Sequence, residues 1–334
     1  MEEAELKEVE ALAQQLAGAP EPVDPNDWPE KLPRQSELLY QKRNYRLWSA
    51  ACLMAHSMTK SPFLRVLLRI EAVDGMRRIA GLWPLDEAVE LLKLSGADLQ
   101  ELSESPLRNR LLQLHCYNAA MVFHEAGHFA KAAEAHAEAA VFCEDEDKKL
   151  IELFMGTMAE LEDMLVSVSP GSGQMILADC LEDLQQLGAR LLELLGDSVD
   201  DMRWKANIKT TLALSGWLVQ KIPPDAATVL YLMGMSPELR KLTKPRVAVL
   251  TAMRLLQDGK LKEASNHLEE VTDQDNITWY CAAMMVKAEI YHRLAKELDY
   301  RATLKKLVNL PKVRHGGVLF VILARRKLDE MNTK

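Results

Sequence analysis

The chain has 334 residues, of which 48% are hydrophobic and 6% aromatic, and its formal net charge is −8. An acidic balance argues against a general nucleic-acid-binding protein, because neutralising phosphates requires clustered Lys and Arg side chains. No stretch alternates β-branched and polar residues over the length of a strand, so the composition predicts an all-α protein.

The N-terminal part is predicted to be an acidic helix followed by a linker. Residues 1–18 are amphipathic and end at Gly18, and residues 19–35 contain several prolines, which cannot continue a helix. The first segment is acidic, whereas a signal peptide begins basic and continues apolar. Even the most apolar stretch, GGVLFVILARRK, has far fewer than the roughly 20 apolar residues of a membrane span. We therefore expect a cytoplasmic protein.

The remaining chain is predicted to form one helix after another. Breaks are expected where Gly, Pro and Ser gather, including Ser95-Gly96, Ser105-Pro106, Pro223-Pro224 and Lys244-Pro245. Helices of about 10 to 20 residues with short connections are typical of antiparallel helix pairs and not of a βαβ fold.

A flexible joint is predicted near the middle of the chain. The sequence SPGSG at residues 169–173 is rich in the residues that interrupt helices. We expect it to divide an N-terminal helical half, residues 36–168, from a C-terminal half, residues 174–334.

Two stretches share the same spacing of small and large residues. In residues 114–142 the pattern is formed by Ala120, Phe123, Gly127, Phe129, Ala132, His136 and Ala139. In residues 245–271 the equivalent positions are Ala252, Leu255, Gly259, Leu261, Ala264, Leu268 and Val271. Small residues let two helices approach closely, and large residues fill the groove beside the contact.

Both stretches resemble the tetratricopeptide repeat, in which a glycine turn joins two such helices. The resemblance implies antiparallel helix pairs stacked as an α-solenoid. Weaker echoes of the pattern occur at Ala88 and near the C-terminus, at Ala288, Tyr291, Ala302 and Leu304. Residues 150–240 carry no repeat signature, so we expect an irregular middle section.

The resemblance also implies a function. The first helices of tetratricopeptide pairs line a groove that binds peptides or helices, so we expect a non-enzymatic adaptor, scaffold, chaperone or regulatory subunit that has a protein partner and no cofactor. The groove-facing residues implied are Tyr117, Asn118, Met121, His124, Glu125, Arg246, Val249, Leu250, Met253 and Gln257. The alternative, that these residues form only an exposed helix face, stays open.

One string suggests a different function. His124, Glu125 and His128 satisfy H-E-x-x-H, which in zinc hydrolases places two imidazoles one helical turn apart and a glutamate beside a metal-bound water. The repeat pattern instead places a turn at Gly127, which would separate the two histidines. His136 does not have the spacing of a third ligand. We therefore expect the string to be coincidental and keep a zinc hydrolase as the alternative.

The two ends of the chain have opposite charge. Residues 1–30 contain nine acids and one base, and residues 301–334 contain nine bases and two acids. The acidic end could dock on the basic end within one chain or between subunits of an oligomer. Alternatively, the N-terminal helix is solvated and the basic end approaches an acidic partner. A nucleic acid could also contact residues 301–334.

Overall fold

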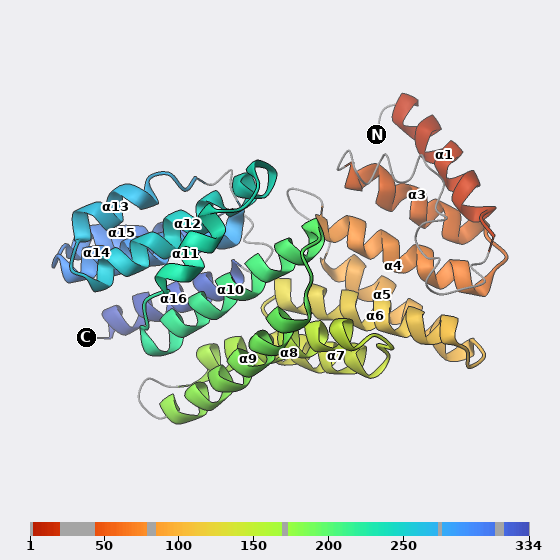
Figure 1. Ribbon diagram of the computed structural model, residues 1–334. Helices are drawn as coiled ribbons and strands as arrows, with labels where there is room; N and C mark the ends of the chain where they lie inside the picture. Colours follow the sequence, from red (N-terminus) through yellow and green to blue (C-terminus); the bar gives the residue numbers. More distant parts are fainter. Residues whose placement is uncertain are drawn as a thin grey trace. The chain divides into compact units, whose positions relative to one another are not determined.

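A computed structural model describes the chain over six ranges: residues 3–20, 44–78, 85–168, 173–272, 276–310 and 317–333 (Figure 1). Every regular element within these ranges is an α-helix, which confirms the predicted all-α class. The helices are α1 (Glu3–Ala17), α3 (Tyr45–Met58), α4 (Pro62–Arg78), α5 (Leu85–Glu101), α6 (Pro106–Glu125), α7 (Phe129–Val141), α8 (Glu146–Ser167), α9 (Gln174–Leu194), α10 (Val199–Gln220), α11 (Ala226–Met233), α12 (Pro237–Gln257), α13 (Leu261–Leu268), α14 (Ile277–Arg293), α15 (Glu297–Val308) and α16 (Val318–Asn332). No helix in the six ranges combines the length and the apolar character needed to cross a bilayer.

The chain forms two compact units. Unit 1 comprises Met1–Phe123 and Glu134–Glu152, and unit 2 comprises His124–Ala133 and Leu153–Lys334. The predicted linker at 19–35 lies outside the described residues apart from its first two positions. Of the predicted joint at 169–173, only Gly173 is described.

In unit 1 the acidic N-terminal helix is packed against the protein. The apolar stripe of α1, which includes Val9, Leu12 and Leu16, is buried in the same core as residues of α3 and α4. Arg46 of α3 also donates a hydrogen bond of 2.8 Å to Glu5. Within unit 1, α1 is therefore a packed helix that turns its acidic face outward, so the alternative of a solvated N-terminal helix holds only for that face.

Helices α3 and α4 of unit 1 pack closely at Gly75, and α4 also carries a buried charged cluster. A Cβ atom on Gly75 would lie 2.3 Å from Ser49 Oγ, so glycine is needed for this approach. The Asp74 carboxylate forms ion pairs with Arg77 and Arg78, each with a nitrogen–oxygen distance of 2.8 Å. Burial alone would raise the pKa of Asp74, but the two guanidinium groups outweigh it and lower the pKa.

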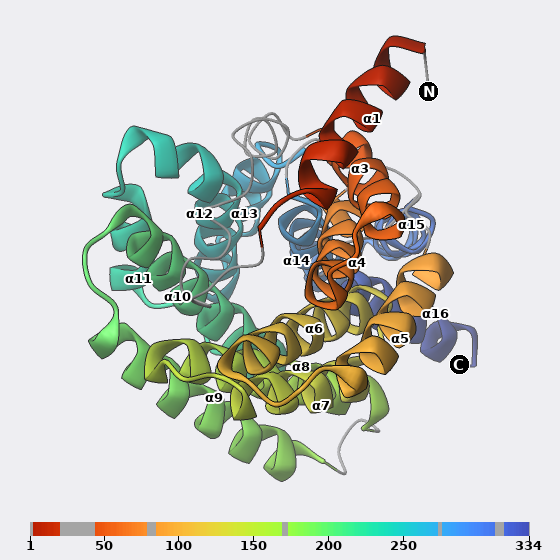
Figure 2. The ribbon, with the colours of Figure 1, turned by 90° about the vertical axis from the view of Figure 1, so that its right-hand side faces the viewer.

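In unit 2 neighbouring helices pack on one another in chain order. Helix α12 contacts α10, α11, α13 and α14 (Figure 2). Helix α15 packs on both α14 and α16. One apolar core joins these helices, and its fully buried members include Leu232, Val249, Val286 and Leu304. Each helix covers its neighbour, as expected of a solenoid-like all-α arrangement.

Two predicted breaks are wrong, because tertiary packing overrides local propensity. Ser95 lies inside α5, where it is fully buried and its hydroxyl donates a hydrogen bond of 2.8 Å to the carbonyl of Leu91. Pro245 lies inside α12, where it removes one backbone donor, but its ring is buried in unit 2. The breaks at Ser105-Pro106 and Pro223-Pro224 are confirmed, since α6 begins at Pro106 and residues 223 and 224 lie between α10 and α11.

Candidate functional site

Three helix pairs are joined by the same turn. The connections α6–α7, α12–α13 and α14–α15 each contain one residue with positive φ: Gly127 at 79°, Gly259 at 74° and Ala295 at 54°. In each pair the first helix ends two residues before this position and the second begins two residues after it. The predicted turns at Gly127 and Gly259 are thus confirmed.

One hydrogen bond recurs in all three turns. The amides of Gly127, Gly259 and Ala295 donate to the carbonyls three residues earlier, at 3.0, 3.3 and 3.0 Å. In the second and third turns the next amide reaches five residues back, at 2.8 and 3.0 Å. These bonds satisfy carbonyls at the end of the first helix, as in other left-handed helix caps.

The third pair, α14 and α15, corrects the weak repeat pattern predicted near the C-terminus. Counted from the turn, Ala288 and Tyr291 occupy the positions of Ala120 and Phe123. Ala302 has no counterpart in the pattern, because the position equivalent to Ala132 is Tyr300. The sequence hid this pair because alanine replaces the glycine at the turn.

Side-chain contacts show that α6 and α7 run antiparallel. The rings of His124 and Phe129 meet near the turn, with centroids 5.4 Å apart. Further from it, the rings of Tyr117 and His136 lie 6.3 Å apart. Residues later in α7 thus contact residues earlier in α6, as in any antiparallel pair of helices.

The H-E-x-x-H string does not form the geometry of a zinc hydrolase. Helix α6 ends at Glu125, and His128 lies exposed in the turn, so the two histidines are not on adjacent turns of one helix. His124 is buried, and its Nε2 lies 2.5 Å from the Glu162 carboxylate. In the six described ranges, no group of three or more His, Cys, Asp or Glu residues could hold a metal ion.

The residues predicted to line a groove are mostly interior. The buried ones are Asn118, His124, Glu125, Val249, Leu250 and Met253. Tyr117, Met121 and Arg246 are half-buried, and Gln257 is exposed. The buried side chains contact the core of the protein itself, so in this conformation they offer no surface to a partner. Helix α12 buries residues on more than one side, since the consecutive residues Ala248, Val249 and Leu250 are all buried.

Arg246 has an internal role. Its Nη1 donates a hydrogen bond of 2.6 Å to Asn207 Oδ1 and lies 3.5 Å from Thr210 Oγ1, both on α10. Its guanidinium carbon is 5.7 Å from the centroid of the Trp279 ring. Burial lowers the pKa of Arg246 to about 10. This side chain therefore ties α12 to α10 and α14.

The basic C-terminal segment is partly engaged with the protein. Arg301 pairs with Glu297 at 3.2 Å and donates to the carbonyl of Met331. Arg326 pairs with Glu330 at 3.4 Å. Residues 311–316, which contribute two of the predicted bases, lie outside the described residues.

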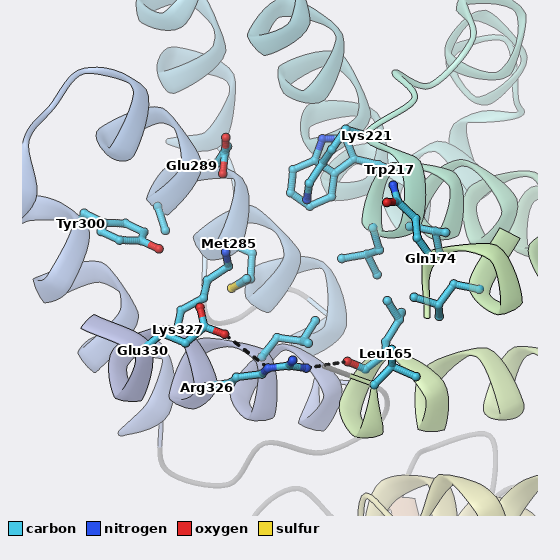
Figure 3. A pocket seen from close by; sticks show the side chains of 16 residues that line it. Leu165, Gln174, Trp217, Lys221, Met285, Glu289, Tyr300, Arg326, Lys327 and Glu330 are labelled. Carbon is cyan, nitrogen blue, oxygen red and sulfur yellow. Dashed lines mark hydrogen bonds and ion pairs between the residues drawn. The ribbon is translucent and has the colours of Figure 1, made fainter. Parts of the chain in front are cut away.

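Unit 2 contains a cavity of about 380 Å³ that the sequence did not predict (Figure 3). Its volume is in the usual range for ligand pockets. The lining is contributed by α8, α9, α10, α14, α15 and α16. It consists of Leu165, Val168, Gln174, Leu177, Trp217, Leu218, Val219, Lys221, Met285, Ala288, Glu289, Tyr300, Leu323, Arg326, Lys327 and Glu330.

Two lysines face this pocket. Lys221 follows the last turn of α10 in a left-handed conformation, and its Nζ lies 4.3 Å from the centroid of the Trp217 ring. Figure 3 shows this pair at one side of the pocket and Lys327 of α16 at another. Desolvation lowers the pKa of Lys221, Glu289 opposes this effect, and the charges of Lys327 and Arg293 add to it. The ammonium groups therefore repel each other.

The acidic side chains of the pocket are already paired. Glu289 lies 3.2 Å from Arg293, and Glu330 lies 3.4 Å from Arg326. Tyr300 is buried, and its pKa is raised by desolvation and then by nearby carboxylates, Glu289 first. The phenol thus stays neutral and can donate a hydrogen bond.

The pocket combines aromatic and aliphatic walls with cationic groups, an arrangement suited to binding. Comparisons of the chain with protein-family models, with curated proteins and with solved structures gave no match. Function is therefore inferred from the geometry of the site.

Proposed function

We propose that the chain is a non-enzymatic, tetratricopeptide-like module that binds a protein or peptide partner as an adaptor, scaffold, chaperone or regulatory subunit. The observation that carries this proposal is the repeated helix pair, with one turn geometry at Gly127, Gly259 and Ala295. Stacked helix pairs supply extended surfaces for recognition. All five cysteines are free, which supports a reducing, cytoplasmic location.

The pocket of unit 2 is the proposed anchor site for the partner. Binding energy at protein interfaces is concentrated where a few side chains enter a well-packed depression. Trp217 and Met285 give this pocket buried apolar walls, and Gln174 lies exposed at its edge. One side chain or short segment of a partner would fill it.

A steric block tests the proposal. In Gln174→Trp an indole is added at the pocket, whereas in Met175→Trp the same side chain is added at a neighbouring residue that is 79% exposed and does not line the pocket. Tagged protein with each substitution is used to isolate partners from native lysate.

We expect the wild type and Met175→Trp to retain the same partner protein and Gln174→Trp to lose it. Thermal unfolding of both variants provides the control for folding. Equal retention by the two variants would contradict the assignment of the pocket, and absence of any specific partner from the wild type would contradict the proposed function.

A further inference from the structure

We infer that the pocket of unit 2 binds one carboxylate carried by an apolar group of the partner, held between Lys221 and Lys327. This inference rests on the proposed function and specifies the chemistry of its anchor site. It is carried by three features of the pocket: unpaired cations, a small net charge and apolar walls.

The two ammonium groups are available to an anion. Within the described part of the chain, neither Lys221 nor Lys327 forms an ion pair with a carboxylate, whereas Arg326 is held by Glu330 and by the carbonyl of Leu165 at 3.4 Å. Lys221 lies against the Trp217 ring, and the charge of Glu289, which is already paired with Arg293, and then the charge of Lys327 act on it. An anion between them would add two attractions that offset their mutual repulsion.

The charge of the lining matches a monoanion. Three cations, Lys221, Arg326 and Lys327, and two anions, Glu289 and Glu330, give a formal balance of +1. One carboxylate neutralises this balance. A dianion such as a phosphate monoester would instead bring excess negative charge beside two carboxylates that already have partners.

The remaining surface of the pocket accepts an apolar group. Trp217 and Met285 are buried in the core of unit 2, and Leu177, Leu218 and Leu323 complete the aliphatic wall. Burial of an apolar group contributes roughly 25 cal/mol per Å² of surface removed from water. Charge and apolar contact thus select a ligand that combines both properties.

The test uses a small acid and its neutral isostere. Binding of 4-phenylbutyrate and of 4-phenylbutyramide is measured by titration calorimetry with the wild type, Lys221→Met and Lys327→Met. Methionine keeps an unbranched side chain one atom shorter than that of lysine and removes the charge. Lys209→Met is the matched control, because Lys209 Nζ also lies over an aromatic ring, 5.3 Å from the centroid of Tyr231, but does not line the pocket.

We expect the acid to bind the wild type and Lys209→Met equally, and each pocket variant about tenfold more weakly. The amide should bind about tenfold more weakly than the acid to the wild type and show no further loss in the variants. Equal binding of acid and amide, equal binding to all four proteins, or no binding of the acid to the wild type would overturn the inference.

Different results would contradict the proposed anchor site and the carboxylate inference. If Gln174→Trp abolishes capture of the partner while Lys221→Met and Lys327→Met retain it, the pocket is the partner site and the carboxylate inference is wrong. If the variants discriminate the small acid but Gln174→Trp retains the partner, the pocket binds a free carboxylate and the proposed anchor site is wrong.

Discussion

Gly127 and Ala295 hold the same position in two different helix pairs. Each residue lies two positions after the first helix of its pair and two positions before the second, with φ of 79° and 54°. Alanine in a left-handed conformation is strained by its Cβ atom, whereas glycine is not. The C-terminal pair therefore stores strain that the other pairs avoid.

Exchanging these residue types should reverse the strain. We expect Ala295→Gly to raise the free energy of unfolding by up to about 1 kcal/mol, and Gly259→Ala to lower it by about 1 kcal/mol. Position 295 is exposed, and a Cβ at position 259 would meet no atom within 4 Å, so neither change alters packing. Urea unfolding measures both values. Destabilisation by Ala295→Gly would contradict the equivalence of the turns.

A larger effect is expected at the first turn. A Cβ atom on Gly127 would lie 2.8 Å from Cγ1 of Val318, so Gly127→Ala adds steric overlap to backbone strain. We expect a loss of about 2 to 3 kcal/mol.

The control is Gly216→Ala inside α10, where a Cβ meets nothing within 4 Å. This change should stabilise the protein by about 0.5 to 1 kcal/mol, because alanine is the better helix former. Similar losses at positions 127 and 216 would show that the turn is not special.

The two histidines of the H-E-x-x-H string should differ in their effect on stability. His124 and its partner Glu162 have side chains only 9% and 14% exposed, so His124→Ala leaves a carboxylate that is largely buried without its partner. We expect a loss of about 2 to 4 kcal/mol, against less than about 0.5 kcal/mol for exposed His128→Ala.

Chemical denaturation with zinc and with a chelator distinguishes the pair of His124 and Glu162 from a metal site. The wild type and His128→Ala should unfold at the same denaturant concentration in both conditions. A zinc-dependent gain in stability that requires both histidines would favour the hydrolase alternative.

Glu71 should make the stability of the protein depend on pH. Burial, aided by the charge of Asp74, raises the pKa of Glu71 from 4.5 to about 7, although Trp48 and Arg78 oppose the increase. The folded protein therefore binds this proton more tightly than the unfolded chain. The resulting stabilisation is fully present below pH 4.5 and is lost as the pH rises through 7.

Glu71→Gln should remove this dependence. We expect the variant to gain about 1 to 3 kcal/mol relative to the wild type between pH 4.5 and pH 8. The free energy of unfolding of both proteins, measured across that interval, provides the comparison. Parallel curves for the two proteins would refute the assignment.

Local sequence indicated most of the helices and the glycine turns, whereas contacts between distant helices decided where α5 and α12 continue and where the pocket forms. Gly127 and Gly259 are visible because only glycine adopts their conformation without strain. Pro245 misled the prediction because burial in unit 2 outweighs the lost backbone hydrogen bond. The turn at Ala295 was not predicted because alanine, unlike glycine, does not indicate a left-handed conformation.

The pocket could not be predicted in the same way. Lys221 and Lys327 are more than 100 positions apart in the chain, and each alone is an ordinary surface cation. Only the packing of α10, α14 and α16 brings them to one cavity. The predicted basic C-terminal segment did contain Arg326 and Lys327, but nothing in its composition indicated which residues they would face.

Site-specific photocrosslinking tests the central claim most directly. A benzophenone amino acid replaces Gln174 at the pocket or Met175 on the neighbouring exposed surface, and the cells are irradiated before lysis. A protein partner anchored in the pocket predicts a covalent adduct of one defined mass from position 174 and little or none from position 175. Adducts of equal yield from both positions, or none from position 174, would contradict it.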